Sequence, residues 1–245
     1  MEFEGKTALI TGAAVGIGRA TALLLAKSGA KLVLLDMDMV KLEKVKKELI
    51  ADGTDALIYA CDISDEECVN KTLSDALEKV GKIDILVNNA ALWRGSSNFV
   101  DTPTDVWRKF LDVNILGTVY ITKAVLPSML ENGYGRIINV SSVAGVYGNA
   151  KMAHYSATKG AVIAFTKALA KEVTSKGVLV NAVSPGSVSS SEESDIDFTS
   201  PSELAFIGRT GSGRENAELI CFLASDKASY ISGQNIQIDG CRKKQ

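Results

Sequence analysis

Two hydrophobic patterns alternate along most of this chain, and the alternation restricts its fold more than any other feature. Short apolar runs rich in Val, Ile and Leu have the length and composition of strands that are buried on both faces. Longer segments whose apolar residues recur every three or four positions are typical of amphipathic helices. The predicted strands cover residues 7–11, 32–36, 56–61, 83–88, 136–141, 179–184 and 235–239. The predicted helices cover residues 17–28, 39–51, 65–80, 104–131, 153–175 and 214–223.

The order of these segments predicts one α/β domain, residues 1–245, with a Rossmann-type doubly wound sheet of seven parallel strands flanked by helices. A helix between consecutive strands is the usual crossover that lets neighbouring strands run parallel. At 245 residues the chain is long enough to bury a substantial core as one such domain. Ser64, followed by Glu67 three residues later, predicts a capping box at the start of the helix at 65–80.

One stretch interrupts the alternation. Residues 187–201 are rich in Ser, Asp and Glu and lack periodicity. They follow a predicted strand, on the edge of the sheet where open α/β sheets bind ligands. We therefore expect a substrate lid over residues 187–207, with a solvated surface loop as the alternative.

The composition excludes several classes of function. The chain is 46% hydrophobic and 23% charged with a formal net charge of −2, so no basic surface favours nucleic acid or an anionic membrane. No apolar run approaches the roughly 20 residues of a membrane-spanning helix, and the acidic start is not typical of a signal peptide. The cysteines show no CxxC or zinc spacing, which fits free thiols in a reducing compartment. We expect a cytoplasmic protein without a metal site, a nucleic-acid partner or a membrane partner.

A glycine-rich turn joins the first predicted strand to the first helix. Gly12, Gly16 and Gly18 permit a tight turn and close approach of the backbone to a ligand. The free N–H groups at a helix N-terminus bind phosphate, so this turn predicts a dinucleotide site. A tight connection without a ligand is the alternative interpretation.

Asp36 indicates which dinucleotide binds. It ends the second predicted strand 18 residues beyond Gly18, where a carboxylate can accept hydrogen bonds from a ribose diol. The positions where a 2′-phosphate would need Arg or Lys hold Ala14, Val15 and Met37, and Asp36 would repel that phosphate. We therefore expect NAD(H) rather than NADP(H). Alternatively, Asp36 caps the following helix, or serves both purposes.

The spacing of the three glycines resembles that of the short-chain dehydrogenase/reductase family, and the resemblance covers nearly the whole chain. It implies that Asp62 and Ile63 contact adenine. Residues 88–91, Asn-Asn-Ala-Ala, resemble the family's Asn-Asn-Ala-Gly turn, with Ala91 in the place of glycine. Residues 185–190 resemble the Pro-Gly-x-Val-x-Thr turn, in which backbone groups of Val188 would bind the nicotinamide carboxamide and Ser190 replaces threonine. The implied cofactor-binding residues are Gly12, Val15, Gly16, Ile17, Gly18, Asp36, Asp62, Ile63, Asn89, Ala90, Tyr155, Lys159, Pro185, Gly186, Val188 and Ser190.

Tyr155 and Lys159 form the centre of the predicted chemistry. Residues four apart share one face of a helix, so the phenol and the ammonium can approach the same cleft. A free phenol has a pKa near 10, and a neighbouring positive charge should lower it toward the working range of an acid/base group. By itself this spacing is common on exposed helix faces.

The family resemblance completes a catalytic quartet of Asn114, Ser142, Tyr155 and Lys159. It implies that Ser142, 13 residues before Tyr155, hydrogen-bonds the substrate oxygen, with Ser141 as the local alternative. Tyr155 would exchange the proton while NAD(H) exchanges the hydride, and Lys159 would also bind the nicotinamide ribose. Asn114 would hold a water that links Lys159 to solvent.

The substrate is the least constrained part of the prediction. The segments that follow the strand ends supply an apolar, partly aromatic set of candidate pocket residues: Trp93, Val143, Val146, Tyr147, Met152 and His154. His154 has an equally good alternative as a structural or exposed histidine. An apolar pocket and NAD(H) favour a hydroxysteroid or another alicyclic secondary alcohol.

Three alternatives remain for the function. A polyol or sugar dehydrogenase is the first. A 3-oxoacyl-(acyl-carrier-protein) reductase is the second, although Asp36 opposes NADPH and Gly133 occupies one carrier-docking position, leaving Lys176 as a partial basic feature. A catalytically silent NAD-sensing scaffold is the third, and the intact quartet argues against it.

We also expect a homotetramer, which the family resemblance implies through the helices at 104–131 and 153–175. An outward apolar stripe on the second helix could consist of Ala161, Phe165, Leu169 and Val173. The same stripe could equally face the sheet.

Overall fold

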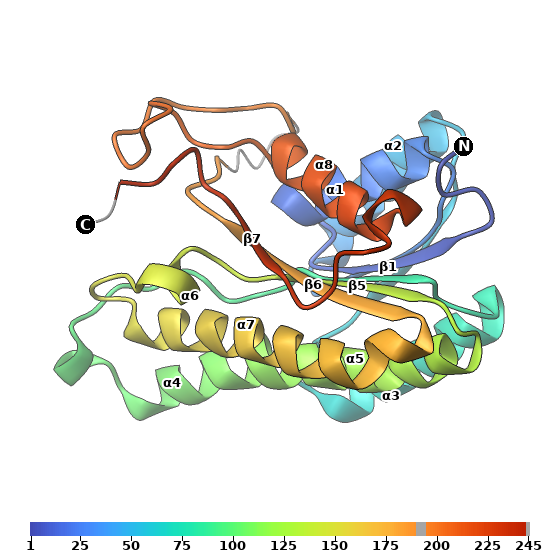
Figure 1. The fold of residues 1–245 in the computed structure, drawn as a ribbon, viewed down its shortest axis with the longest axis horizontal. Helices are drawn as coiled ribbons and strands as arrows, with labels where there is room; N and C mark the ends of the chain where they lie inside the picture. Colours follow the sequence, from blue (N-terminus) through green and yellow to red (C-terminus); the bar gives the residue numbers. More distant parts are fainter. Residues whose placement is uncertain (190–194, 244–245) are drawn as a thin grey trace.

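The structure, a computed structural model, describes residues 1–189 and 195–243. At its centre is a parallel sheet of seven strands in the order β3-β2-β1-β4-β5-β6-β7 (Figure 1). The strands are β1 (Thr7–Thr11), β2 (Lys31–Asp36), β3 (Ala56–Ala60), β4 (Ile85–Asn88), β5 (Gly135–Val140), β6 (Val178–Pro185) and β7 (Asn235–Ile238). The predicted doubly wound parallel sheet is confirmed, and no strand boundary differs from its prediction by more than two residues.

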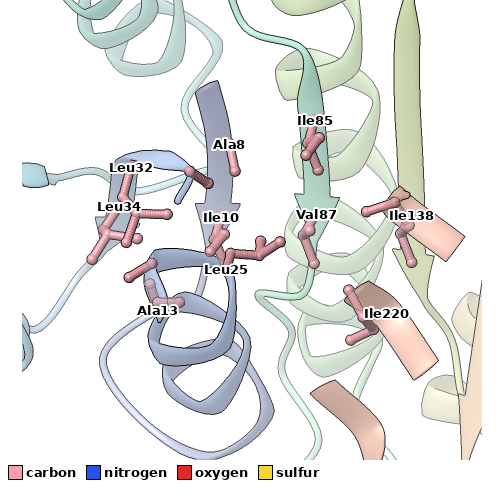
Figure 2. Close-up of a cluster of buried hydrophobic side chains, with 14 of the residues drawn as sticks. Ala8, Ile10, Ala13, Leu25, Leu32, Leu34, Ile85, Val87, Ile138 and Ile220 are labelled. Carbon is pink, nitrogen blue, oxygen red and sulfur yellow. The ribbon is translucent and has the colours of Figure 1, made fainter. Parts of the chain in front are cut away.

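Helices cover both faces of the sheet (Figure 1). One face carries α1 (Gly16–Lys27), α2 (Met39–Ala51) and α8 (Gly213–Ala224), and the other carries α3 (Glu66–Val80), α5 (Gly117–Glu131) and α7 (Ala153–Val173). Successive strand residues point to opposite faces, so Ile10 joins the first apolar core and Leu9 the second. In the first core, Leu25 of α1 and Ile220 of α8 lie against side chains of the central strands (Figure 2).

The strand order reverses at β1, which pairs with β2 on one side and β4 on the other. Ligands of open α/β sheets bind in the crevice that such a reversal creates at the carboxyl ends of the strands. Asn89 closes this edge of the sheet: its N–H donates to Thr11 Oγ1 (3.0 Å), and its Nδ2 donates to the carbonyls of Thr11 and Gly12 (3.0 Å each). The turn after β1 is thereby held against the end of β4.

A continuous helix of 28 residues, Thr104–Glu131, consists of α4 (Thr104–Leu111), a π-helical turn (Asp112–Leu116) and α5. In the part of the chain that the structure describes, this is the one helix long and apolar enough to cross a membrane by length and composition. The expectation that no apolar stretch approaches that length is therefore wrong for this helix. Its inner side packs against α3, α7 and the sheet, and this core packing accounts for part of its apolar character.

The start of α3 differs from the prediction. The cap is Asp65, whose Oδ1 accepts hydrogen bonds from the N–H groups of Glu67 (2.9 Å) and Cys68 (3.1 Å). The N–H and hydroxyl of Ser64 instead donate to Asp62 Oδ1, at 2.9 Å and 2.7 Å. The predicted Ser64 capping box is wrong because Asp62 already binds this serine.

All four cysteines are free thiols. Cys61 and Cys68 nevertheless lie together, with their sulfur atoms 3.9 Å apart, because α3 packs back on the end of β3. Burial raises the pKa of Cys61 to about 12, so this thiol is poorly reactive at neutral pH.

Candidate active site

The turn between β1 and α1 forms a cradle for a phosphate group. Gly18 packs so closely that an added Cβ would lie 2.1 Å from the Gly12 carbonyl oxygen, whereas a Cβ on Gly16 would meet open space. Val15 precedes α1 without a side-chain cap, and the first turn of the helix carries no acidic residue. The N–H groups of this turn are therefore available to an anion, and the site fits the pyrophosphate of a dinucleotide.

Asp36 lies beside this cradle. Its Oδ2 accepts a hydrogen bond from the Ala14 N–H and its Oδ1 accepts one from the Asp38 N–H, both at 3.0 Å. The residue that caps α2 is Asp38, so the prediction of Asp36 as a helix cap is wrong. Val15 and Met37, next to these contacts in sequence, are exposed and uncharged. The carboxylate is thus fixed at the end of β2 with neutral side chains beside it.

The predicted adenine-contacting pair is placed at the end of β3. The carboxylate of Asp62 holds Ser64, as described above. Ile63 is buried, and its side chain lies so close to Gly117 at the start of α5 that an added Cβ there would be 2.7 Å away. Ile63 therefore fixes the spacing between β3 and α5.

The turn after β6 lies on the same edge of the sheet. The Gly186 N–H donates to the Ile238 carbonyl (3.0 Å), and Val188 forms a bridge with Gly211. An added Cβ on Gly186 would approach Asp239 Cα to 2.9 Å, so close packing requires this glycine. Ser190 and the predicted lid residues 190–194 lie outside the described residues.

Two serines follow β5, and only one of them faces Tyr155. Ser141 is buried and donates to the Lys159 carbonyl (2.7 Å), so its hydroxyl serves the backbone of α7. The Ser142 hydroxyl is close enough to Tyr155 to lower the pKa of that phenol, and its Oγ accepts the Ala144 N–H (3.1 Å). Ser142 and Tyr155 thus present their hydroxyls to the same point.

Lys159 lies beneath Tyr155 in a fully buried position. Its Nζ is 5.9 Å from the centre of the Tyr155 ring and donates to the Val140 carbonyl (2.7 Å). Burial lowers the pKa of Lys159 to about 8, because the charged form loses its hydration.

The expected lowering of the tyrosine pKa by Lys159 is not found. Burial raises the pKa of Tyr155, and the neighbouring Ser142 hydroxyl opposes this rise. The ammonium of Lys159 is turned to the Val140 carbonyl and is itself desolvated, so it does not offset the burial of the phenol. In this geometry Tyr155 is a protonated phenol at neutral pH.

Asn114 occupies the π-helical turn and is buried. Its Oδ1 accepts the Leu92 N–H (2.7 Å), and its Nδ2 donates to the Leu92 carbonyl (3.0 Å) and to Thr158 Oγ1 (3.0 Å). The Thr158 hydroxyl donates in turn to the Tyr155 carbonyl (2.8 Å). Asn114 therefore links the segment after β4 to the backbone of the helix that carries Tyr155.

Thr158 is a residue of this site that sequence reasoning missed. The available signal was weak: a threonine one position before Lys159, in a helix where β-branched residues are not preferred. The sequence also did not reveal a buried amide ladder, in which Asn88 Nδ2 donates to Asn139 Oδ1 and Asn139 Nδ2 donates to Thr166 Oγ1, each at 2.9 Å. This ladder joins β4, β5 and α7 beneath the site.

The candidate substrate residues divide into two groups. His154 is 2% exposed and packs between the rings of Trp107 and Phe110, with ring centres 6.0 Å and 4.3 Å away. This burial favours the alternative of a structural histidine, since consecutive helical side chains point about 100° apart and Tyr155 takes the other direction. Val143 is also buried, which removes it from the pocket surface.

Trp93, Tyr147 and Met152 remain accessible at the site. The Tyr147 hydroxyl donates to Gln237 Oε1, so β7 supports this side of the pocket. Val146 is also exposed. Four of the six candidates, Trp93, Val146, Tyr147 and Met152, are therefore accessible to a substrate.

Comparison with known proteins identifies the family. The family model described as short chain dehydrogenase matches residues 6–198. The chain belongs to the short-chain dehydrogenase family. It is 39% identical to the 3-oxoacyl-(acyl-carrier-protein) reductase FabG of Thermotoga maritima and 35% identical to the 2-dehydro-3-deoxy-L-rhamnonate dehydrogenase (NAD(+)) of a Sphingomonas species. These alignments cover 98% of this chain and 98% and 96% of the two relatives.

A solved structure of an NAD+-bound xylitol dehydrogenase superposes with a TM-score of 0.91 at 34% identity, covering 98% of this chain and 100% of that one. As a short-chain dehydrogenase, the chain is an oxidoreductase that acts on alcohol and keto groups with a nicotinamide cofactor. The family match includes both the phosphate cradle and the Ser142–Tyr155–Lys159 group.

Proposed function

We propose that this short-chain dehydrogenase transfers a hydride between NAD(H) and a secondary alcohol or ketone, with Tyr155 as the group that exchanges the proton. The observation that carries the proposal is the convergence of the Tyr155 and Ser142 hydroxyls above the buried Lys159. Asn114 is a positioning residue in this scheme, since its side chain binds backbone and Thr158.

The bound nicotinamide supplies or accepts the hydride. In reduction, Tyr155 gives its phenolic proton to the carbonyl oxygen, which the Ser142 hydroxyl holds in place. A phenol whose pKa is raised by burial is protonated at neutral pH and ready for this step. Lys159, with a pKa of about 8, can exchange a proton near neutral pH and so help to restore the phenol. In oxidation the phenolate accepts the proton of the alcohol.

Tyr155→Phe tests the chemistry. The variant keeps the ring and loses the acid, so kcat should fall at least about 100-fold while NADH binding is unchanged. Ser142→Ala should also lower kcat, and Ser141→Ala serves as the comparison on the neighbouring position. If the parent binds NADH but reduces no member of a broad ketone panel, the protein is a silent NAD-binding scaffold instead.

We further propose that the cofactor is NAD(H). Asp36 offers a carboxylate at the end of β2, and the neutral Val15 and Met37 provide no counter-charge for a 2′-phosphate. Asp36→Ser should reduce kcat/KM for NADH by about 10- to 100-fold, since a hydrogen bond to a charged group contributes roughly 1.5–3 kcal/mol. Adding Met37→Arg should raise kcat/KM for NADPH. A parent enzyme that prefers NADPH would contradict this proposal.

Reduction of 3-oxoacyl thioesters is the second candidate, favoured by the 39% identity to the Thermotoga maritima reductase over nearly the full length. Two residues oppose it: Asp36 disfavours NADPH, and Gly133 occupies one position where a carrier would dock. The hydroxysteroid hypothesis loses support, because Val143 and His154 are buried and do not line the pocket. A panel of oxoacyl thioesters, steroids, polyols and sugar acids with both cofactors separates these substrates.

A further inference from the structure

The loop between β4 and α4 is fixed against the start of α7 at both of its ends. Leu92 is held by the side chain of Asn114 through its N–H and its carbonyl. Five residues later, the Ser97 N–H donates to the Lys151 carbonyl (2.9 Å), two residues before α7 begins. The side chains between these two anchors therefore lie beside the first turn of α7, which carries Tyr155.

Arg94 lies in the middle of this loop and is exposed. Its guanidinium stacks over the Trp93 ring at 5.1 Å, which orders the side chain without neutralising it. Within residues 1–189 and 195–243, no carboxylate pairs with Arg94. A guanidinium that is ordered by this stacking, and that has no carboxylate partner among the described residues, is suited to a planar oxyanion.

Lys151 adds a second unpaired cation on the other side of the Ser97 contact. It is exposed, forms no ion pair with any described carboxylate, and has a φ of +63°, which is unusual for a residue with a side chain.

The charge balance around these two residues is one-sided. The two segments that carry these cations, residues 89–98 and 141–156, contain no Asp or Glu, and the next acidic residue along the chain is Asp101. By contrast, Arg209 and Arg214 are each paired, with Glu215 (2.6 Å) and Asp197 (2.5 Å). The uncapped N-terminus of α7 adds positive potential to the same place.

We propose that Arg94 and Lys151 bind an oxyanion of the substrate, a carboxylate or a phosphate, while its carbonyl reacts at Tyr155. The substrate class is then an oxo acid and its hydroxy acid, or a phosphate-bearing oxo compound, rather than a neutral ketone. This inference rests on the proposed function of the Tyr155 site, because the oxyanion belongs to the molecule that is reduced there.

Matched substrate pairs test the inference. Acetoacetate is compared with ethyl acetoacetate, and S-acetoacetyl pantetheine 4′-phosphate with S-acetoacetyl pantetheine, each with NADH. We expect the parent to favour the charged member of a pair at least 10-fold in kcat/KM. The pair that shows this preference separates the carboxylate from the phosphate. Raising the salt concentration should reduce the preference, because both cations are exposed.

Two variants assign the preference to these residues. Arg94→Gln and Lys151→Asn remove one charge each, and Asn tolerates the left-handed backbone of position 151. Each should raise KM for the charged substrate about 5- to 20-fold and leave kcat/KM for its neutral partner unchanged. Lys71→Gln, which removes an exposed charge on α3, should change neither. Thermal melting of all three variants controls for folding.

The failures of the two proposals are distinguishable. If the parent reduces neutral and charged members equally, and Tyr155→Phe abolishes both reactions, the oxyanion site is wrong and the proposed chemistry stands. Equal losses on both substrates in Arg94→Gln would likewise overturn the site, since Arg94 would then only stabilise the loop. If neither pair is reduced while a member of the broad ketone panel is reduced and Tyr155→Phe abolishes that reaction, the oxyanion site is wrong and the proposed function stands.

Discussion

Lys159 is a buried cation, and its burial destabilises the fold at neutral pH. Its pKa falls from an ordinary value of 10.5 to about 8, so below pH 8 the folded protein bears the full cost of burying the charge. Lys159→Met should therefore raise the free energy of unfolding at pH 7 by about 1–3 kcal/mol, after allowing for the lost hydrogen bond to Val140. The same change should abolish turnover. Urea unfolding at pH 7 measures the difference.

The pH dependence of this stabilisation has a definite sign. The unfolded chain binds more protons at Lys159 than the folded chain between pH 8 and 10.5, so the penalty in the parent disappears as the pH rises through that window. The advantage of Lys159→Met should accordingly shrink from pH 7 to pH 9.5. Lys167→Met, at an exposed position of the same helix, should show no such trend. A constant advantage of Lys159→Met at both pH values would contradict this account.

At the scale of elements, Thr158 connects the π-helical turn to α7. Thr158→Val removes the hydroxyl that accepts from Asn114 and donates to the Tyr155 carbonyl. We expect kcat to fall about 10-fold with little change in KM for NADH. The loop after β4 would no longer be held in a fixed position relative to Tyr155. Thr158→Ser keeps the hydroxyl and should restore kcat. A fall in kcat that serine fails to restore would indicate a packing role instead.

The turn between β1 and α1 gives a second prediction at this scale. Gly18→Ala would place a Cβ 2.1 Å from the Gly12 carbonyl oxygen, so the turn must open and the helix must move off the sheet. We expect a loss of at least about 2 kcal/mol in stability and much weaker NADH binding. Gly211→Ala, whose nearest neighbour would be 3.6 Å away, is the matched control and should melt like the parent. Equal melting temperatures for the two variants would refute the close-packing argument.

Local sequence patterns were enough to predict the seven strands and the longer helices. The helix at 39–51 coincides with its prediction, because its periodicity and its ends are encoded within a few residues. The four-residue helix α6 (Ala144–Tyr147) was not predicted, since it is shorter than any helical period pattern. The π-helical turn was also missed, because nothing local distinguishes its extra residue from the helix around it.

Site residues could be predicted where the residue type and spacing indicate the chemistry. They could not be predicted where distant packing contacts determine the position of a side chain. The spacing from Tyr155 favoured Ser142 over Ser141, and the structure places Ser142 beside Tyr155 and turns Ser141 to the α7 backbone. His154 was assigned to the pocket because it adjoins Tyr155 in sequence. Its true surroundings come from α4, more than 40 residues away along the chain, and no local pattern shows that contact.

At the scale of the whole molecule, three of the four residues of the apolar stripe on α7 face inward, and Ala161 is exposed. Leu169 and Val173 are buried in the core beneath the sheet, and Phe165 packs against that core. Phe165, Leu169 and Val173 therefore pack in the core of the monomer, as the second of the two alternatives from the sequence proposed. The long helix Thr104–Glu131 differs, because only 39% of its most apolar window is buried.

We predict that the long helix packs against a second copy of the chain and that the protein is a homo-oligomer. The family resemblance makes a tetramer the expected form. Leu111 on α4 is 43% exposed and belongs to this uncovered surface. Leu111→Glu should shift the sedimentation coefficient toward that of the monomer, because the interface would bury an unpaired carboxylate. Lys109→Glu, at an exposed position of the same helix, also introduces a carboxylate and serves as the control for charge alone. If the parent sediments as a monomer at micromolar concentration, the apolar surface needs another explanation and the oligomer prediction is wrong.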